Sequence, residues 1–348
     1  MHAINQSVAM GRDVQIAGVA FYFNIAPCAH NCSFCLLGNK PVTRLPFERM
    51  AQLVERFLDA RENSGMKFQI FHWIRYSYNI EIHTLRRWVA LWRRQGRIPD
   101  LMIGGMPMLS ADQMKRWLEP WLLAGVEEMH ASFAGSPETH DMLYRRNGDY
   151  EYRMRMMRIG VEAGMRLNQR LFITRQTITQ TPALLQRLDE LPCTKLERHC
   201  SPFFYMGGAA MLEHNRIDET IRNEMSGLPT EFAAAARHWR SEREWIASLA
   251  KEHDFPEPVM LRIDPDESNI DWLEKASIDE IVERMVSRTR DAYASIPSRF
   301  ELMRLCGKTS NYSIYAQRND VERLWLDRWL VHNPTHFDRK LTHLSMTH

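Results

Sequence analysis

Three cysteines crowd into one short stretch of the chain. Cys28, Cys32 and Cys35 are separated by three and two residues in the segment Cys-Ala-His-Asn-Cys-Ser-Phe-Cys. Three closely spaced thiolates on one loop can converge on a single metal face and leave a fourth position open. A structural zinc site would want a fourth ligand at a comparable spacing, and a cluster used only for electron transfer would usually recruit a fourth cysteine. The spacing therefore favours a three-cysteine [4Fe–4S] cluster whose open iron can chelate a small molecule.

Strands and helices alternate on both sides of this segment. Residues 18–25 are apolar nearly throughout and predict a buried strand, and apolar residues recur at helical spacing from Phe47 to Leu58. Strands separated by single helices imply parallel pairing through right-handed crossovers. We therefore predict an α/β fold, a partial (β/α)6 barrel like part of a TIM barrel, over residues 16–212. Its further strands are expected near 68–73, 100–103, 127–133, 167–174 and 195–199.

The pattern changes past Asn215. Long helical stretches are predicted at 217–226, 231–252 and 278–294, around one strand candidate at 258–263. We expect residues 213–348 to form a mainly helical region that closes the mouth of the barrel. Active sites of barrel enzymes lie at the C-terminal ends of the strands, where the cysteines, Gly104 and Ser132 all fall in this interpretation.

Composition excludes several classes of protein. The chain has 348 residues, with 45 basic and 43 acidic side chains and a net charge of +2, which argues against an obligate nucleic-acid binder. No apolar run approaches the ~18–20 residues of a membrane span, and residues 1–11 lack the basic and apolar parts of a targeting signal. We expect a cytoplasmic protein with neither a nucleic-acid nor a membrane partner.

The cysteine segment resembles the signature of the radical S-adenosylmethionine superfamily. It has that family's spacing, aromatic Phe34 precedes its third cysteine, and it follows the first strand of a (β/α) series. The resemblance implies a [4Fe–4S] cluster on Cys28, Cys32 and Cys35, whose open iron binds the amino and carboxylate groups of S-adenosylmethionine. Electron transfer would then cleave the sulfonium and give a 5'-deoxyadenosyl radical that abstracts a substrate hydrogen. The alternative is a zinc or purely structural site with His30 as its fourth ligand.

Two later segments are similar to the branch of this family that contains peptide-modifying and cofactor-building members. One runs from Glu128 to Tyr150 and the other from Ser201 to Ala210, so the resemblance covers about residues 16–212. It implies that Ser132 approaches the cofactor, that Asn168 contacts its ribose or carboxylate, and that Tyr205 lines the adenine side.

The glycine pair departs from the family pattern. Family members usually end the second strand with Gly-Gly-Glu, which helps to hold the methionine amino group, whereas Gly104-Gly105 ends the third strand here. The second strand ends at His72-Trp73 without glycines. Either the site for the amino group is rebuilt or the strand count is off by one. We favour a rebuilt site, with Gly105 and Phe34 among the cofactor-binding residues. His72 is either a participant or a buried core histidine.

Other residues leave several functions open. Cys193, Cys200 and Cys306 could be lone buried thiols, ligands of an auxiliary cluster or thiol hydrogen-atom donors. The eight arginines between Arg145 and Arg175 could anchor a substrate carboxylate or phosphate, or form a solvated helix face.

The sequence thus predicts a radical S-adenosylmethionine enzyme whose substrate belongs to one of two classes. The branch resemblance suggests a peptide or protein side chain, and the lack of a cysteine-rich C-terminal extension suggests a small metabolite. About 20 residues precede the first strand, too few for an N-terminal cobalamin or peptide-recognition domain. A flavodoxin- or ferredoxin-type protein is the expected electron donor. The competing class is a non-enzymatic iron–sulfur or zinc protein that binds a partner through its helical half.

Overall fold

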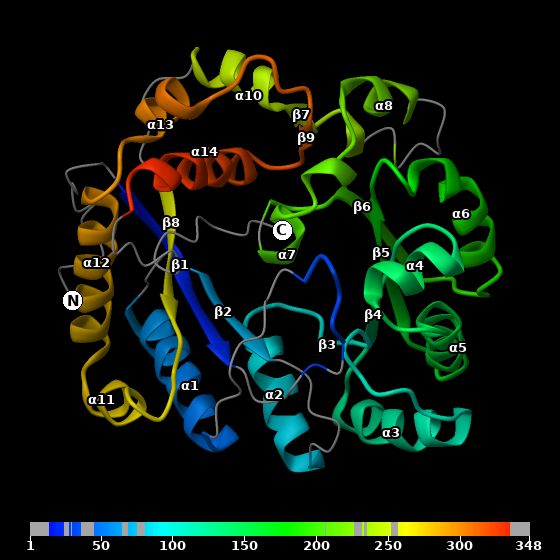
Figure 1. Cartoon of the computed structure of the whole chain (residues 1–348). Coiled ribbons are helices and arrows are strands. Elements are labelled where there is room, and N and C mark those ends of the chain that lie inside the picture. Colours follow the sequence, from blue (N-terminus) through cyan, green and yellow to red (C-terminus); the bar gives the residue numbers. More distant parts are fainter. Residues whose placement is uncertain are drawn as a thin grey trace.

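Parallel strands with helices between them make up the first part of the chain (Figure 1). The computed structural model describes residues 14–23, 28, 30–35, 45–64, 69–74, 81–205, 207–225, 232, 235–251 and 257–334. The elements of this part are β1 (Val14–Phe23), α1 (Phe47–Ser64), β2 (Gln69–Ile74), α2 (Ile82–Arg94), β3 (Asp100–Met102), α3 (Ala111–Ala124), β4 (Glu128–Phe133), α4 (Pro137–Tyr144), α5 (Asp149–Glu162), β5 (Arg166–Ile173), α6 (Thr181–Asp189), β6 (Leu196–Pro202) and α7 (Gly207–Ala210).

The strands form two parallel groups, in the orders β2-β1-β8 and β3-β4-β5-β6. Gly18 of β1 is opposite Gln69 of β2, and Ser132 of β4 is opposite Arg170 of β5. Within the described residues, β2 and β3 are not hydrogen-bonded to each other. Parallel neighbours joined through helices confirm the predicted α/β class and the partial barrel.

The strand β8 (Glu257–Ile263) joins this sheet from the far end of the chain. It pairs in parallel with β1, from Val14 opposite Glu257 to Phe21 opposite Ile263. Leu261 and Ile263 are buried in the core. A strand at the edge of a sheet has unpaired backbone groups, and β8 covers that edge of β1. A segment past residue 213 is therefore part of the barrel sheet, whereas the division of the chain at 212/213 stays a prediction.

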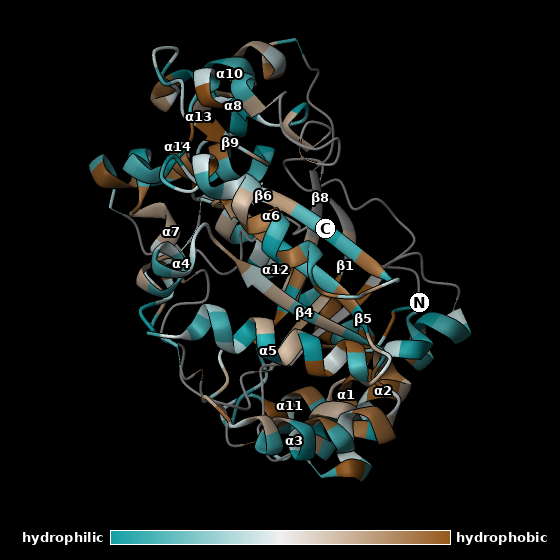
Figure 2. Ribbon diagram, turned by 90° about the vertical axis from the view of Figure 1, so that its right-hand side faces the viewer, coloured by the Kyte–Doolittle hydropathy of each residue, from teal (hydrophilic) through white to brown (hydrophobic). Residues whose placement is uncertain are grey.

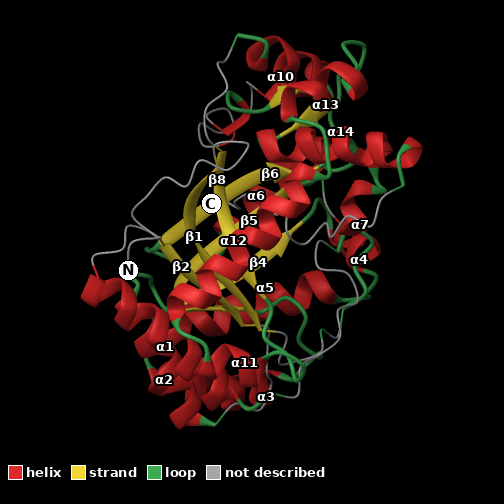
Figure 3. Cartoon of the chain, turned by 90° about the vertical axis from the view of Figure 1, so that its left-hand side faces the viewer, coloured by secondary structure: helices red, strands yellow, loops and turns green. Residues whose placement is uncertain are grey.

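The remaining elements are mostly helical: α8 (Glu219–Glu224), β7 (Arg240–Ser241), α10 (Glu242–Leu249), α11 (Ile270–Lys275), α12 (Ile278–Ala294), α13 (Arg299–Cys306), β9 (Ile314–Tyr315) and α14 (Arg318–His332). The predicted helix over 278–294 is confirmed. A single helix over 231–252 was wrong, because Ser241 and Glu244 form a capping box that starts a new helix after β7. Figure 3 shows the strands between α1, α2 and α3 on one side and α10, α13 and α14 on the other.

Helices cover the outer face of the strands with their apolar sides, while hydrophilic residues dominate the outward faces (Figure 2). On α1 the residues Met50, Leu53, Val54 and Phe57 are buried, and the Phe57 ring lies 5.0 Å from that of Phe21. No helix among the described residues combines the length and the apolar character that a membrane crossing needs.

The alternation along β4 decides which side chains face the barrel interior. Met129 faces α5, because a Cβ placed on Gly160 of that helix would lie 2.8 Å from its Cε. Successive side chains of a strand point to opposite faces. Glu128, His130 and Ser132 therefore face inward.

Candidate functional site

The loop with Cys28, Cys32 and Cys35 is held by backbone contacts to α4 and α7. Ser33 donates to the Leu143 carbonyl from its backbone nitrogen at 2.9 Å and from its hydroxyl at 3.0 Å. The Gly208 nitrogen donates to the Cys35 carbonyl at 2.8 Å. Since α4 follows β4 and α7 follows β6, the loop lies at the C-terminal ends of the strands, as the sequence predicts. Cys28 is exposed, and the other two thiols are half-buried.

Phe34 anchors this loop to the protein. Its ring stacks on Phe203 at 4.7 Å, meets Tyr144 edge-to-face at 4.9 Å and is tilted against Phe172 at 5.2 Å. Phe34 is only 5% exposed. Aromatic pairs of this kind add about 0.5–1.5 kcal/mol beyond area burial. The observed contacts of Phe34 are therefore packing contacts, and its predicted role in cofactor binding stays a prediction.

A fully buried arginine lies behind the loop. Arg153 donates to the Asp149 carboxylate and to the Ser132 carbonyl, both at 2.7 Å, and its Nη2 lies 3.3 Å from Nδ1 of His30. The Nδ1 atom of His30 is in turn 3.8 Å from Sγ of Cys32. The Cβ position of Gly104 is 3.7 Å from the same guanidinium. Arg153 thus connects the cysteine loop with the ends of β3 and β4.

Further charged groups surround this arginine. Arg146 contacts Nε2 of His30 and the Met106 carbonyl. Asp149 is fully buried and also accepts a contact from His140 Nε2 at 3.1 Å. Its pKa lies well below the usual range, because the hydrogen bond with His140 and the charge of Arg153 outweigh its burial.

Burial shifts the other titratable groups of the site toward their neutral forms. It lowers the pKa of His30 to about 4, helped by the charge of Arg153, and it lowers the pKa of His140 to about 4 as well. Burial raises the pKa of the Cys32 thiol to about 12, although Arg153 opposes this shift. In the metal-free protein this thiol is protonated at neutral pH, so metal binding must release its proton.

The donor set fits an iron–sulfur cluster better than a zinc ion. Tetrahedral zinc with thiolates at its usual bond length holds the sulfurs about 3.8 Å apart. Among the described residues, Cys28, Cys32 and Cys35 do not form a group of side chains close enough to share one metal ion. A cubane binds each thiolate to a different iron and requires a wider spacing. Both nitrogens of His30 already face arginines, which weakens the alternative with His30 as a zinc ligand.

The structure brings only some of the predicted cofactor-binding residues to the cysteines. Ser132 and Gly105 lie at the ends of β4 and β3 around Arg153, and Gly105 has a φ of 89°. Asn168 is near the N-terminal end of β5, opposite His130, and Tyr205 contacts Asp320 and Tyr315 of the C-terminal region. His72 lies in β2, but its side chain is outside the described residues.

Asn168 belongs to a second polar group inside the barrel. His130 Nε2 is 2.5 Å from Glu128 and 3.1 Å from Asp100, and the Asn168 amide is 3.4 Å from Glu128 and 3.3 Å from Glu197. The His130 hydrogen bond lowers the pKa of Glu128. These hydrogen-bonded side chains form a polar floor of the barrel interior, near the N-terminal ends of β4 and β5.

The remaining cysteines lie on separate elements. Cys200 is in β6, opposite Leu171, while Cys193 precedes β6 and Cys306 ends α13. Four of the eight arginines between 145 and 175 are exposed, as a solvated face requires: Arg145, Arg155, Arg158 and Arg175. The buried Arg153 was missed as a site residue. The sequence does carry one indication of it: Asp149 lies one helical turn earlier, at the spacing at which two oppositely charged residues of a helix form an ion pair.

Comparisons with known proteins return only distant structural similarity. No family model matches the chain, and no curated protein matches it. It is similar to Streptococcus suis SuiB bound to precursor peptide SuiA, with 10% identity, a TM-score of 0.44, and coverage of 64% of this chain and 47% of that one. It is also similar to anSMEcpe with bound AdoMet and Cp18Cys peptide, with 12% identity, a TM-score of 0.36, and coverage of 52% of this chain and 50% of that one. Methylornithine synthase (PylB) is similar with 14% identity, a TM-score of 0.36, and coverage of 54% of this chain and 55% of that one.

These three proteins are radical S-adenosylmethionine enzymes. The chain spans about half the length of each of these three solved chains. At these identities and TM-scores the likeness is partial, so the function rests on the chain's own residues.

Proposed function

We propose that this chain is a radical S-adenosylmethionine enzyme. The observation that carries the proposal is the three-cysteine loop, which α4 and α7 hold at the C-terminal ends of parallel strands. When bound, a [4Fe–4S] cluster on Cys28, Cys32 and Cys35 supplies the electron that cleaves S-adenosylmethionine. A flavodoxin- or ferredoxin-type donor is the partner that this chemistry requires, and a cytoplasmic location is part of the proposal.

The buried arginines provide the charge that an anionic cluster needs. Thiolate-bound clusters carry negative charge, and nearby hydrogen bonds and charges tune their reduction potential. Arg153 is buried and paired with Asp149, while Nη2 of Arg146 is a buried donor without a hydrogen-bond partner among the described residues. These two guanidinium groups would stabilise the metal-bound thiolates.

Glycine and serine at the neighbouring strand ends leave room for a cofactor. Gly105 lies in a turn and adopts the left-handed backbone conformation, and as a glycine it has no side chain that would fill the adjacent space. Ser132 is half-buried at the inward face of β4, and its carbonyl is fixed by Arg153. We propose that Gly105 and Ser132 line the cofactor, with amino-group recognition at the end of the third strand.

For the substrate we propose a peptide or protein side chain, on the resemblance of residues 128–150 and 201–210 to the peptide-modifying branch. Hydrogen-bonding groups of the interior, among them His130 and Asn168, would face the substrate. A small metabolite is the second candidate, favoured by the partly closed, polar floor around Glu128. The solved neighbours include both peptide-bound chains and a methylornithine synthase, so they do not choose between the two.

The test is anaerobic. The protein would be reconstituted with iron and sulfide, reduced, mixed with S-adenosylmethionine and assayed for 5'-deoxyadenosine by chromatography. We expect product from the wild type and from Cys193→Ala, a matched control away from the loop. The Cys28, Cys32 and Cys35 triple-alanine variant should bind no cluster and give no product. Full iron loading without product would overturn the proposal and favour a non-enzymatic iron–sulfur protein.

A further inference from the structure

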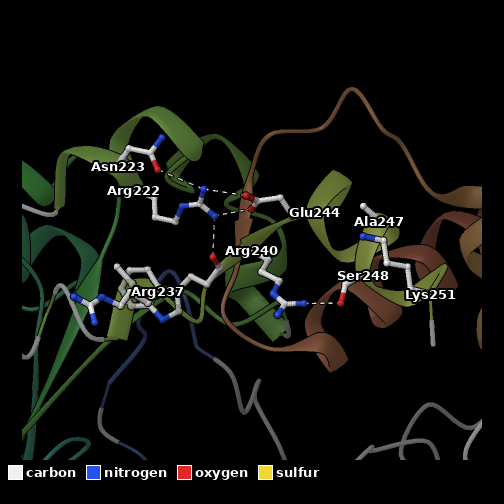
Figure 4. A pocket seen from close by; sticks show the side chains of 10 residues that line it. Arg222, Asn223, Arg237, Arg240, Glu244, Ala247, Ser248 and Lys251 are labelled. Carbon is white, nitrogen blue, oxygen red and sulfur yellow. Dashed lines mark hydrogen bonds and ion pairs between the residues drawn. The ribbon is translucent and has the colours of Figure 1, made fainter. Parts of the chain in front are cut away.

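A cleft of about 870 Å³ lies in the C-terminal region, apart from the cysteine loop (Figure 4). It lies between α8, the segment 236–240 and α10. None of these segments contributes a residue to the site around Cys32. The lining residues are Arg222, Asn223, Ala236, Arg237, Trp239, Arg240, Glu244, Ala247, Ser248 and Lys251. Four of them are cationic, and Glu244 is the single acidic residue of the lining.

The carboxylate of Glu244 is already engaged within the protein. It accepts hydrogen bonds from Arg222 at 2.6 and 3.0 Å and from the Ser241 backbone nitrogen at 2.7 Å, in the capping box of α10. Arg222 also donates to the Trp239 carbonyl at 2.9 Å. Figure 4 shows the bonds between Arg222 and Glu244 at the cleft. Glu244 and Arg222 therefore neutralise each other and brace this part of the cleft.

Among the described residues, the other three cations have no counter-charge. Arg240 donates to the Ser248 hydroxyl at 2.6 Å and lies over the Trp245 ring at 4.9 Å, so it is positioned but not neutralised. Arg237 and Lys251 are exposed and have no interaction partner within the described part of the chain. A concave surface lined by one sign of charge attracts and concentrates the opposite charge.

The size of the cleft decides which anion fits. Its volume is near the upper end of the range for small-ligand pockets, about 300–1,000 Å³, and is far larger than one phosphate or carboxylate requires. Arginine binds carboxylates through two parallel hydrogen bonds, and neighbouring arginines can grip successive acidic side chains. We propose that this cleft binds an acidic segment of a peptide substrate and anchors it outside the barrel. This inference rests on the peptide substrate of the proposed function.

Binding can be measured on the full-length chain without any radical chemistry. A fluorescein-labelled oligoglutamate peptide would be titrated with the protein and followed by fluorescence anisotropy. We expect R237E/K251E to weaken binding by about tenfold or more, and higher ionic strength to weaken wild-type binding. The control is K115E/R116E, which reverses the same two charges on the exposed face of α3. If R237E/K251E does not fold, R237Q/K251Q replaces it in the assay, provided that its thermal unfolding matches that of the wild type.

Three results would overturn the inference. They are equal binding by the wild type and R237E/K251E, equal weakening by the control, and displacement of the peptide by inorganic phosphate or a short oligonucleotide at the same charge concentration. Failure here is distinguishable from failure of the proposed function. Peptide-independent formation of 5'-deoxyadenosine should be the same in the wild type and in R237E/K251E. A chain that binds the peptide but forms no 5'-deoxyadenosine contradicts the proposed function alone.

Discussion

Arg153 and Asp149 form a fully buried ion pair one helical turn apart, directly behind the cysteine loop. Removing one partner takes the nearest counter-charge away from the other buried group, and such a loss costs up to about 3–5 kcal/mol. We therefore expect Arg153→Met and Asp149→Asn each to lower the free energy of unfolding strongly. The double variant should lose clearly less unfolding free energy than the sum of the losses in the two single variants. Urea denaturation of all four proteins measures this coupling, and additive losses would contradict a direct pairing.

Asp320 predicts a pH dependence at a single residue. It is 2% exposed, its Oδ1 accepts from the Tyr205 backbone nitrogen at 3.0 Å, and its Oδ2 is a buried atom without a hydrogen-bond partner among the described residues. Burial raises its pKa to about 6, although the charge of Arg216 opposes the shift. Because the folded pKa lies above the unfolded one, the protonated form favours folding, and stability falls as the pH rises from about 4 to about 6.

We accordingly expect Asp320→Asn to flatten this dependence. Relative to the wild type, the variant should gain up to about 3 kcal/mol of unfolding free energy between pH 4 and pH 8. Urea denaturation across that range is the measurement. Asp112→Asn, at an exposed position of α3, is the control and should follow the wild-type curve. An unchanged slope in Asp320→Asn would show that this carboxyl group is ionised throughout.

At the residue scale the sequence indicated the cysteine loop but not its support. Spacing along the chain is visible in the sequence, so Cys28, Cys32 and Cys35 could be identified. The contact of Arg153 with His30 joins residues 123 positions apart and leaves no local pattern. The strand that carries Asn168 was predicted from the sequence, but the position along β5 depends on the pairing with β4, and the cofactor role stays a prediction for Asn168. Its neighbours are Glu128 and Glu197 rather than the cysteines.

Between elements, the closest approach at the site is that of α7 to the cysteine loop. A Cβ on Gly208 would lie 2.7 Å from the Ser33 carbonyl oxygen and 3.1 Å from the Cys35 nitrogen. Both contacts are backbone atoms, so the loop itself would have to move. We expect Gly208→Ala to reduce iron incorporation and 5'-deoxyadenosine formation markedly, with a stability loss of about 1–3 kcal/mol.

The matched control is Gly160→Ala. Its Cβ would meet the flexible tip of Met129 at 2.8 Å, which can move aside. Iron analysis after reconstitution and thermal unfolding would compare the two variants. Normal iron content in Gly208→Ala would contradict the view that α7 fixes the geometry of the cysteine loop.

Helices were easier to predict than the sheet for a physical reason. Apolar periodicity and capping residues are local signals, and Ser110 and Gln113 form such a capping box at the start of α3. The pairing of β8 with β1 joins residues more than 200 positions apart, which composition and periodicity cannot show. Local signals also explain the error at 231–252, where the capping box at Ser241 had been overlooked.

Across the whole molecule, the two ends of the chain depend on each other. Besides the β1–β8 pairing, Arg56 of α1 donates to the carbonyls of Leu273, Glu274 and Ala276, at 2.6–2.9 Å. Arg49 adds a paired contact with Glu274 at 2.6 and 2.7 Å. These bonds close the edge of the sheet with residues past the predicted boundary at 212.

We therefore expect a fragment of residues 1–212 not to fold by itself. Its β1 edge would be open to pairing with other chains, and the core would lose the buried Leu261 and Ile263. Aggregation, or a broad thermal transition in circular dichroism, is the expected result, and co-expression of residues 213–348 should restore a soluble complex. A fragment that melts cooperatively without its partner would instead show that the barrel is an autonomous domain. In that case β8 would be an addition to a sheet that is already stable.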